Sequence, residues 1–205
     1  MEERYWQNWD NADASKRIDE YWIKSEGAWR ELVCKKIQEF VGTDDNLLEV
    51  GCGSGLICHC LLAHGFPKLK YSGGDVSEKM LELARKRYPE ISFRNLDIFD
   101  LDLEDRSIDN VICIHVLQHL PHYEDAVREL MRVTKKRLYI VSWFQDEEQI
   151  SFTKPAEKWA NQRFFNNRYS LRKFEDFVHG LADVTISREK IQNVSWAFKI
   201  QRDQP

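Results

Sequence analysis

The strongest constraint on the fold is a short apolar run that leads into three alternating glycines. Leu47–Val50 is followed by Gly51, Gly53 and Gly55, and a helix-forming segment begins at Leu56. Glycine allows a sharp turn and a close approach of the backbone to a ligand, and the start of a helix offers unpaired N–H groups. The segment therefore predicts a strand, a glycine turn and a helix, with a binding site at the turn.

Strands and helices alternate throughout residues 46–143. Such alternation predicts a parallel sheet with right-handed crossovers. The nearly continuous apolar run 110–114 is typical of a central strand that is covered on both faces. The last two strands have no helix between them, so we expect them to pair antiparallel. The predicted strands are 47–50, 69–74, 91–95, 110–114, 137–143, 184–187 and 195–200, and the predicted helices lie within 14–41 and at 56–64, 78–88, 123–133 and 170–179.

Two acidic residues at strand ends complete a pattern that suits an adenosine. Asp75 lies 20 residues after Gly55, where a carboxylate can accept hydrogen bonds from both ribose hydroxyls. Asp97 follows the third strand and can accept from the exocyclic amine of adenine, with Val76 and Ile98 placed to sandwich the base. Each acid alone is equally explained as a solvated loop carboxylate or a cap. The glycine turn and both acids together favour an adenosine site.

The spacing of the glycines argues against a dinucleotide. The dinucleotide fingerprint requires Gly or Ala three positions after Gly53, and Leu56 stands there. The pattern is instead Glu49-x-Gly51-x-Gly53-x-Gly55, and with it the chain resembles class I S-adenosylmethionine-dependent methyltransferases. Further segments that carry the resemblance are Gly74–Ser77 with Met80, Leu81 and Ala84, Asn95–Ile98, Ile108–Cys113, Val116–Leu120, Arg128–Leu130 and Arg132–Val133.

The resemblance implies an α/β fold with a seven-stranded, mostly parallel sheet whose last strand is antiparallel, and with helices on both faces. We expect a single domain over 1–205. Its expected parts are an N-terminal helical cap (1–42), a cofactor-binding core (46–143), an irregular substrate lid (144–169), and a last helix with the terminal strand pair (170–205). One departure is visible: Lys135-Lys136-Arg137 replaces the Pro-Gly-Gly that usually precedes the fifth strand, in a turn far from the cofactor.

The resemblance also implies S-adenosylmethionine as cofactor and S-adenosylhomocysteine as product. The three glycines would cradle the methionine part, and backbone around Ile114 and His115 would face the sulfonium. An aromatic residue of the N-terminal helix often closes over the cofactor in such enzymes, and Tyr21 or Trp22 is the nearest candidate. The predicted cofactor-binding residues are Glu49, Gly51, Cys52, Gly53, Gly55, Asp75, Val76, Asp97, Ile98, Ile114 and Tyr21.

His115 is the candidate catalytic residue. It ends the central strand at the mouth of the expected pocket, and an imidazole that titrates near neutrality can act as a general base. The alternative is a packing histidine or one of the cofactor shell. His119 stands in a short turn where a structural role is favoured, and His122 follows Pro121 as a loop or helix-start residue. A base must reach the substrate proton, so geometry decides among them.

The leading hypothesis for the reaction is methyl transfer to an O or N atom of a small-molecule acceptor. Two classes of nucleobase methyltransferase are disfavoured. Enzymes that methylate exocyclic amines usually carry an Asn/Asp-Pro-Pro-aromatic motif where this chain has Ile114–Leu117. Enzymes that methylate C5 of pyrimidines need a catalytic Cys, typically after Pro, whereas Cys113 lies inside a strand. A second hypothesis is a methyltransferase that acts on a protein or tRNA through the basic stretch Arg163–Lys173. The same stretch could instead bind a carboxylate or phosphate, or form the solvated start of a helix. A third is a cofactor-binding protein without transfer activity. Several tryptophans could line an aromatic pocket or simply pack in the core: Trp6, Trp9, Trp22, Trp143 and Trp159.

Composition bounds the remaining partners. The net charge of −4 argues against nucleic-acid binding by bulk electrostatics. We expect no membrane span and a cytoplasmic location, because no run of about 18 apolar residues is present and the polar start resembles neither a signal nor a transit peptide. The five cysteines predict reduced, buried thiols. No metal is expected, because Cys58, Cys60 and His64 lack the spacing of a zinc site. The sequence leaves the oligomeric state open.

Overall fold

The computed structural model describes residues 6–25, 28–41, 44–146, 148–152, 164, 166–181 and 183–203. Its strands are β1 (Leu47–Val50), β2 (Tyr71–Asp75), β3 (Ser92–Asn95), β4 (Ile108–Ile114), β5 (Thr134–Gln145), β6 (Ile150–Phe152), β7 (Asn166–Ser170), β8 (Val184–Gln192) and β9 (Ser195–Arg202). Its helices are α1 (Ala12–Lys24), α2 (Ala28–Phe40), α3 (Leu56–Ala63), α4 (Glu78–Arg87), α5 (Glu124–Val133) and α6 (Leu171–His179), with short 3₁₀ turns η1 (Lys68–Lys70) and η2 (Leu117–His119).

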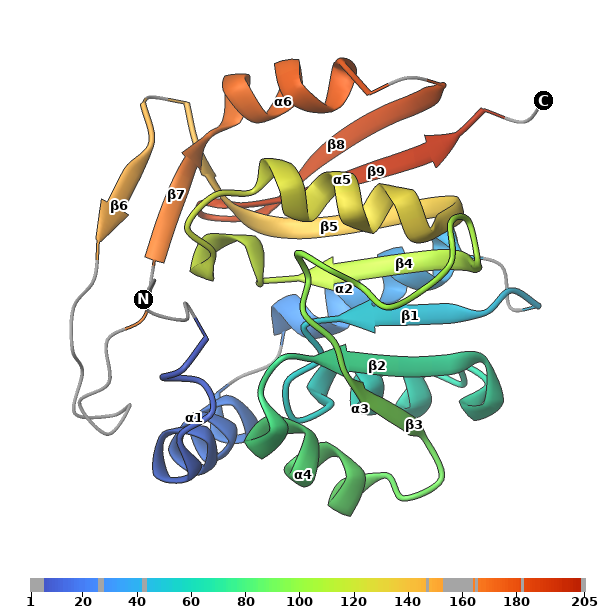
Figure 1. The fold of residues 1–205 in the computed structure, drawn as a ribbon, viewed down its shortest axis with the longest axis vertical. Helices are drawn as coiled ribbons and strands as arrows, with labels where there is room; N and C mark the ends of the chain where they lie inside the picture. Colours follow the sequence, from blue (N-terminus) through green and yellow to red (C-terminus); the bar gives the residue numbers. More distant parts are fainter. Residues whose placement is uncertain are drawn as a thin grey trace.

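The main sheet has the strand order β3-β2-β1-β4-β5-β9-β8 (Figure 1). Neighbouring strands from β3 to β5 pair in parallel, whereas β9 pairs antiparallel with both β5 and β8. The predicted seven-stranded sheet with an antiparallel last strand is therefore confirmed. The arrowheads of β1 and β4 point to the side of the molecule where α1 and the β6–β7 hairpin lie (Figure 1). That edge is where ligands bind in open α/β sheets.

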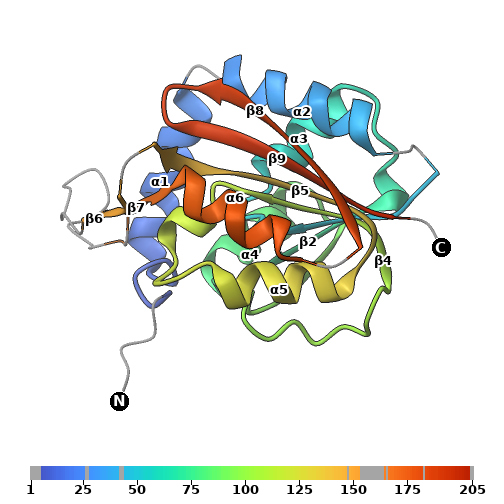
Figure 2. The same cartoon turned by 90° about the horizontal axis from the view of Figure 1, so that it is seen from above.

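Helices cover both faces of the sheet, as predicted. Figure 2 shows α2 and α3 on one side and α5 and α6 on the other. Successive residues of a strand point to opposite faces, so Leu47 packs with α2 and α3 whereas Leu48 packs with α5 and α6. The same alternation divides Ile112 from Val111 on the central strand. The buried strand runs thus hold the tips of β1, β2 and β4 in fixed positions.

Local capping explains where several helices begin. The Oγ atom of Ser77 accepts a hydrogen bond from Met80 N at 3.2 Å, and that of Ser170 accepts from Lys173 N at 3.4 Å. Both predicted caps are confirmed. The predicted helical region of the N-terminal cap consists of two helices, α1 and α2, and its expected end at Gly42 lies outside the described residues.

The largest difference from the sequence prediction concerns residues 144–169, which we expected to be irregular. Instead β5 continues to Gln145, and β6 and β7 form an antiparallel hairpin that pairs in parallel with the end of β5 through Phe144 and Gln145. The hairpin has a physical anchor: Tyr169 Oη donates to Leu117 O and Leu120 O, both at 3.0 Å. Polar stretches such as Asn166–Ser170 give little strand signal by themselves, because this stabilisation comes from distant residues.

The N-terminal segment docks on the start of α4. Ser77 Oγ donates to Trp9 O at 2.8 Å, and Asp10 Oδ1 accepts from Lys79 N at 3.0 Å. Arg87 then joins three parts of the molecule. Its guanidinium donates to Ser54 O at 2.6 Å and to both carboxylate oxygens of Asp19 at 3.0 and 2.9 Å. Helix α1 is therefore fastened next to the glycine turn.

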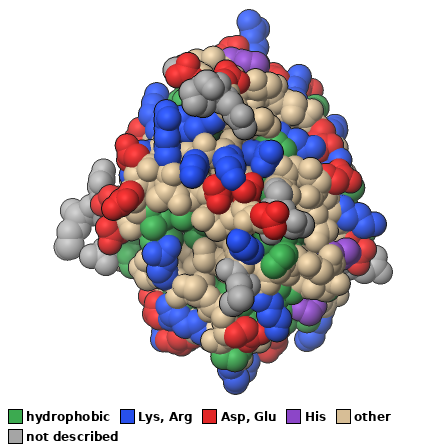
Figure 3. Space-filling model, turned by 90° about the vertical axis from the view of Figure 1, so that its right-hand side faces the viewer, with side chains coloured by type: hydrophobic (Ala, Val, Ile, Leu, Met, Phe, Trp, Pro, Cys, Tyr) green, Lys and Arg blue, Asp and Glu red, His purple; other side chains and the backbone are tan. Residues whose placement is uncertain are grey.

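The opposite end of the sheet is a mixed-charge surface, on which Lys/Arg and Asp/Glu side chains alternate (Figure 3). Lys136, from the turn that departs from the family pattern, pairs there with Asp45 and Asp109. All five cysteines are buried free thiols. No helix within the described part of the chain is long and apolar enough to cross a membrane.

Candidate functional site

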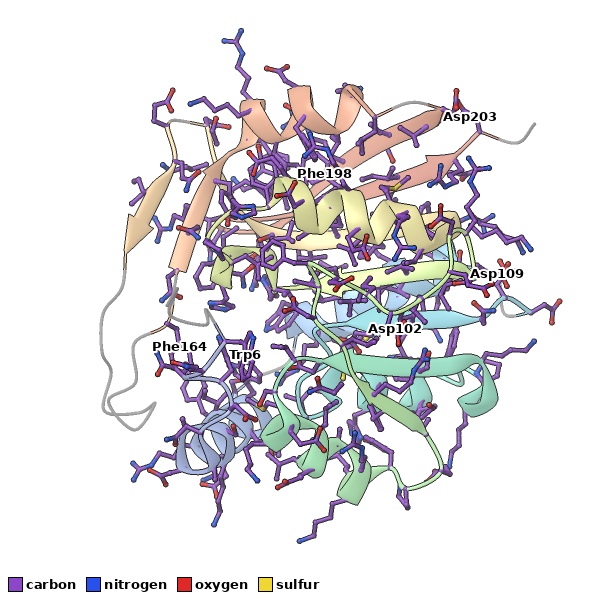
Figure 4. All side chains as sticks on the ribbon, in the orientation of Figure 1. Trp6, Asp102, Asp109, Phe164, Phe198 and Asp203 are labelled. Atoms are coloured by element: carbon purple, nitrogen blue, oxygen red, sulfur yellow. The ribbon has the colours of Figure 1, made fainter. Side chains whose placement is uncertain are left out.

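A cavity of about 680 Å³ opens at the carboxyl ends of the central strands, a size typical of small-molecule sites. One end of it, here called the glycine end, is formed by the tips of β1 and β2 with the glycine turn. The other, the aromatic end, is formed by rings from the N-terminal segment, η2, β5 and Phe164. Figure 4 places Trp6 and Phe164, which both line the cavity, beside α1 and the end of β7.

The glycine turn has the backbone conformation that its sequence predicts. Gly51, Gly53 and Gly55 have φ angles of 79°, 53° and 80°, in the left-handed region that favours glycine. The amides of Gly51 and Cys52 both donate to Gly74 O, at 2.7 and 3.0 Å, which fastens the turn to β2. A Cβ atom on Gly51 would lie 2.1 Å from a methyl carbon of Val116, so a side chain there is sterically excluded.

Asp75 points toward the glycine turn from the end of β2. Its Oδ2 accepts from Gly53 N at 2.8 Å, and its Oδ1 accepts from Ser77 N at 2.9 Å. Burial raises the pKa of this carboxyl, although the backbone hydrogen bonds oppose the rise. An acceptor group is therefore held at the glycine end by backbone groups that its own strand and the turn provide.

Glu49 is the second acid of the glycine end and is almost fully buried. Tyr71 Oη donates a hydrogen bond to its Oε2. Desolvation raises the pKa of Glu49 to about 8, despite the opposing effect of the tyrosine. At neutral pH this carboxyl is thus largely protonated and adds little negative charge to the cavity.

Most of the sequence-predicted site residues meet at this cavity. Two lie outside its lining: Gly55 begins α3 beside the rings of Tyr88 and Phe93, and Asp97 caps its own loop by accepting from Phe99 N at 3.0 Å. The predicted residues that do line it are Glu49, Gly51, Cys52, Gly53, Asp75, Val76, Ile98, Ile114, His115 and Tyr21. Of the two aromatic candidates, Trp22 lies over the turn: its ring is 3.7 Å from the point where a Cβ atom on Gly53 would stand.

Aromatic rings form a continuous wall at the other end. Ring centroids are 4.3 Å apart for Trp9 and Phe164, 4.9 Å for Trp9 and His119, and 5.9 Å for His119 and Trp143. The wall continues to His115, whose ring lies 6.3 Å from Trp143. Such a wall suits a flat, largely apolar ligand.

His115 stands between the two ends of the cavity. Its φ angle of 56° is unusual for a residue with a side chain, and strain of this kind is often found at functional sites. The ring packs edge-on to Trp29, with centroids 4.8 Å apart. Its Nδ1 atom is buried without a hydrogen-bond partner, and desolvation lowers the pKa of the imidazole to about 3. The side chain is therefore neutral at physiological pH, with a nitrogen unpaired beside the cavity.

The structure adds site residues that the sequence analysis missed. Trp29 and Arg30 come from the start of α2, Gln118 from η2 and Arg168 from β7. Arg168 belongs to the basic stretch Arg163–Lys173. The sequence analysis expected no strand there, so it did not predict that Arg168 faces the cavity while its neighbours are buried. Trp6, Trp9, Trp22 and Trp143 line the cavity as the pocket hypothesis expected, and Trp159 lies outside the described residues.

Comparison with known proteins supports the resemblance seen in the sequence. Residues 48–141 match the family described as "Methyltransferase domain". The matched segment runs from β1 to β5 and contains the glycine turn, Asp75 and His115. This segment, just under half of the chain, is thus similar to a methyltransferase domain, in agreement with the resemblance to class I S-adenosylmethionine-dependent methyltransferases. The glycine end is formed by the matched segment, whereas Trp9, Trp29 and Arg168 come from outside it.

Individual relatives agree with this family. A demethylmenaquinone methyltransferase of Lactococcus lactis is 28% identical over 150 residues, which cover 71% of this chain and 57% of that protein. A trans-aconitate 2-methyltransferase of Variovorax paradoxus is 36% identical over 84 residues, which cover 41% of this chain and 32% of that protein. The chain thus spans at most about half the length of these two relatives.

The likeness of fold extends beyond the methyltransferase domain. The crystal structure of an S-adenosylmethionine-dependent methyltransferase from Mesorhizobium loti superposes with a TM-score of 0.66 at 15% identity, covering 86% of this chain and 99% of that one.

Within the described ranges no group of three or more His, Cys, Asp and Glu side chains is arranged to hold a metal ion.

Proposed function

We propose that this protein transfers a methyl group from S-adenosylmethionine to an oxygen or nitrogen atom of a small-molecule acceptor. One observation carries the proposal: a single cavity joins the glycine turn and Asp75 to a wall of aromatic rings, with His115 between them. A cofactor at the glycine end and an acceptor against the rings would then meet beside His115. The names of the two curated relatives, which act on a menaquinone precursor and on trans-aconitate, support an acceptor of small size.

The residues of the glycine end fit this cofactor. The turn of Gly51 and Gly53 leaves room for the methionine part, and Ser54 Oγ is buried there without a hydrogen-bond partner. Asp75 provides an acceptor for ribose hydroxyls, and Val76 and Ile98 line the cavity where a flat base would lie between apolar side chains. Glu49, Cys52 and Ile114 complete the floor.

The cofactor supplies a methyl group that is already electrophilic, on a sulfonium. The protein therefore has three tasks: to align the acceptor atom with that methyl group, to exclude water and to receive a proton. The rings of the aromatic end orient the acceptor and exclude water. The neutral imidazole of His115 can accept a hydrogen bond from the acceptor, but its low pKa makes it a weak proton acceptor at neutral pH, which favours a role in orienting the acceptor. The acceptor–carbon bond forms as the sulfur–carbon bond breaks, and S-adenosylhomocysteine leaves.

Cofactor binding is the first test, and it depends on Asp75. Isothermal titration calorimetry should show that the wild type binds S-adenosylmethionine and S-adenosylhomocysteine. Asp75→Asn should weaken binding by about 10- to 100-fold, because hydrogen bonds to a charged group contribute about 1.5–3 kcal/mol. Asp102→Asn is a matched control, since Asp102 is exposed and lies outside the cavity. Absence of binding by the wild type, or full binding by Asp75→Asn, contradicts the proposal.

Turnover separates the three hypotheses for the reaction. Labelled S-adenosylmethionine should be consumed with a panel of small hydroxylated and amino compounds, and not with tRNA or protein extracts. Transfer to tRNA or protein alone would favour the second hypothesis. Binding without transfer to any member of the panel would favour a regulatory, cofactor-binding role. Loss of transfer in His115→Asn, with cofactor affinity retained, would support the role of His115 in the transfer step.

A further inference from the structure

One guanidinium group at the aromatic end has no hydrogen-bond or ion-pair partner among the residues that the structure describes. Arg168 lines the cavity from β7, and its Nε atom is buried without a hydrogen bond. No ion pair to Arg168 is present among the residues that the structure describes. A buried donor that lacks an acceptor costs about 1–3 kcal/mol, and more when the group is charged. Arg168, which is half-buried with its Nε atom shielded from solvent, therefore differs from the arginines of the same chain that form ion pairs.

The position of Arg168 is set by its neighbours on β7. Residues Asn167 and Tyr169 point the other way, into the core, where Asn167 Nδ2 donates to Leu120 O at 2.6 Å and Tyr169 Oη donates to Leu117 O at 3.0 Å. Because side chains alternate along a strand, these buried anchors turn Asn166 and Arg168 toward the cavity. The guanidinium is thus supported by a rigid element rather than a loop.

The acids of the cavity do not neutralise Arg168. Asp75 is held by the amides of Gly53 and Ser77 at the glycine end, and Glu49 accepts from Tyr71. The other lining guanidinium, Arg30, donates to the carbonyl groups of Trp22 and Ser25, at 2.8 and 2.9 Å. Among the described lining residues, Arg168 is consequently the cation whose guanidinium makes no hydrogen bond to the protein, whereas that of Arg30 is tied to α1 and its C-cap.

We propose that Arg168 binds a carboxylate of the acceptor, and that the acceptor is a flat carboxylic acid whose body packs against the aromatic wall. This inference rests on the proposed function, because it assigns the substrate class of the same site. A single guanidinium matches a carboxylate through two parallel N–H···O bonds, here from its terminal nitrogens. The rings of Trp9, His119 and Trp143 supply the flat surface beside it.

The test compares acids with their neutral amides. Hydroxy- and aminobenzoic acids and hydroxycinnamic acids are titrated into the protein saturated with S-adenosylhomocysteine, and the corresponding primary amides are titrated in parallel. The wild type should bind at least one acid ten-fold or more tightly than its amide. Arg168→Gln should remove this preference while leaving the Kd of S-adenosylhomocysteine unchanged. Arg168→Lys should recover part of it, because it restores the charge without the planar fork.

Arg172→Gln is the matched control. Arg172 belongs to the same basic stretch but is exposed on α6 and does not line the cavity, so its variant should keep the preference. The proposal is wrong if no acid of the panel binds, if phosphorylated analogues bind in their place, or if Arg168→Gln still prefers acids. It is also wrong if Arg168→Gln loses S-adenosylhomocysteine. Failure of the wild type to bind S-adenosylhomocysteine would instead overturn the proposed function.

Discussion

The two ends of the cavity are built in different ways. The glycine end consists of backbone groups and two acids from β1, β2 and the turn between β1 and α3, and its contacts join strand tips that are neighbours in the sheet. The aromatic end consists of side chains that come from distant parts of the chain. Trp9 and Phe164, for example, are separated by more than 150 positions, yet their ring centroids are 4.3 Å apart.

This difference separates what the fold must keep from what it can vary. The glycine turn is held by its left-handed backbone angles and by hydrogen bonds from its amides to Gly74 O and Asp75, so a change of side chain elsewhere hardly alters it. A wall of rings and one arginine, by contrast, changes its shape with each substitution. The comparison predicts that damage at the glycine end affects stability and cofactor together, whereas damage at the aromatic end affects the acceptor.

The largest effect is expected for Gly51→Ala. The left-handed conformation costs a non-glycine residue about 1–2 kcal/mol, and overlap of the new Cβ with Val116 adds about 1–3 kcal/mol. Urea unfolding should show the free energy of unfolding reduced by about 2–5 kcal/mol. Calorimetry should show that S-adenosylhomocysteine no longer binds.

A second glycine supplies the control for Gly51→Ala. Gly65 has a φ angle of 85°, but no atom lies within 4 Å of its Cβ position. Gly65→Ala should therefore lose only about 1 kcal/mol and bind cofactor normally. If the two variants behave alike, the steric argument for the turn is wrong. Val116→Ala should restore part of the stability of Gly51→Ala, because it removes the overlapping methyl groups.

The sequence predicted the glycine end because its signals are local. Glycine at φ above zero, a carboxylate at a strand end and a serine cap such as Ser77 are each required by the backbone of a few residues. The alternation of strands and helices likewise predicted the parallel core of the main sheet. Asp97 shows the limit of such reasoning, because position at a strand end did not reveal that its side chain closes its own loop.

The aromatic end could be predicted only in part. Tryptophans at 6, 9, 22 and 143 were candidates, but the sequence does not say which rings meet. The hairpin β6–β7 was missed because Asn167 and Tyr169 become strand residues through hydrogen bonds to Leu117 and Leu120, far away along the chain. The role of Arg168 depends on that hairpin, and so it was hidden as well.

An intermediate effect is expected for Tyr169→Phe, which tests whether the hairpin positions the aromatic end. The substitution removes the hydrogen bonds to Leu117 O and Leu120 O without changing the ring. The free energy of unfolding should fall by about 1–2 kcal/mol. Acceptor binding should weaken while the Kd of S-adenosylhomocysteine stays the same, since the glycine end does not contact the hairpin anchor.

The control for Tyr169→Phe is another buried tyrosine of the same sheet. The hydroxyl of Tyr139 is buried without a hydrogen-bond partner. Tyr139→Phe should therefore be neutral or slightly stabilising, because it removes a polar group that is already unsatisfied. Equal losses in both variants, or a change in cofactor affinity in Tyr169→Phe, would mean that the two ends are not independent.

The last effect is a difference in pH dependence between the two ends. Glu49, at the glycine end, has a pKa raised from 4.5 to about 8, so the folded protein holds a proton that the unfolded chain releases. Its contribution to stability is complete below pH 4.5 and is lost as the pH rises through 8. His115, where the aromatic wall meets the middle of the cavity, has a pKa lowered from 6.5 to about 3. Its contribution is complete above pH 6.5 and is lost as the pH falls toward 3.

Variants that replace each group with a side chain that does not titrate separate the two opposite dependences of stability on pH. Glu49→Gln keeps an acceptor for Tyr71, and His115→Asn keeps a residue that tolerates a positive φ angle. Relative to the wild type, Glu49→Gln should gain stability from pH 4.5 to 8, and His115→Asn should gain it as the pH falls from 6.5. Urea unfolding at pH 5, 6.5 and 8 measures both. Parallel slopes for the two variants would show that one of these side chains is not buried as the structure places it.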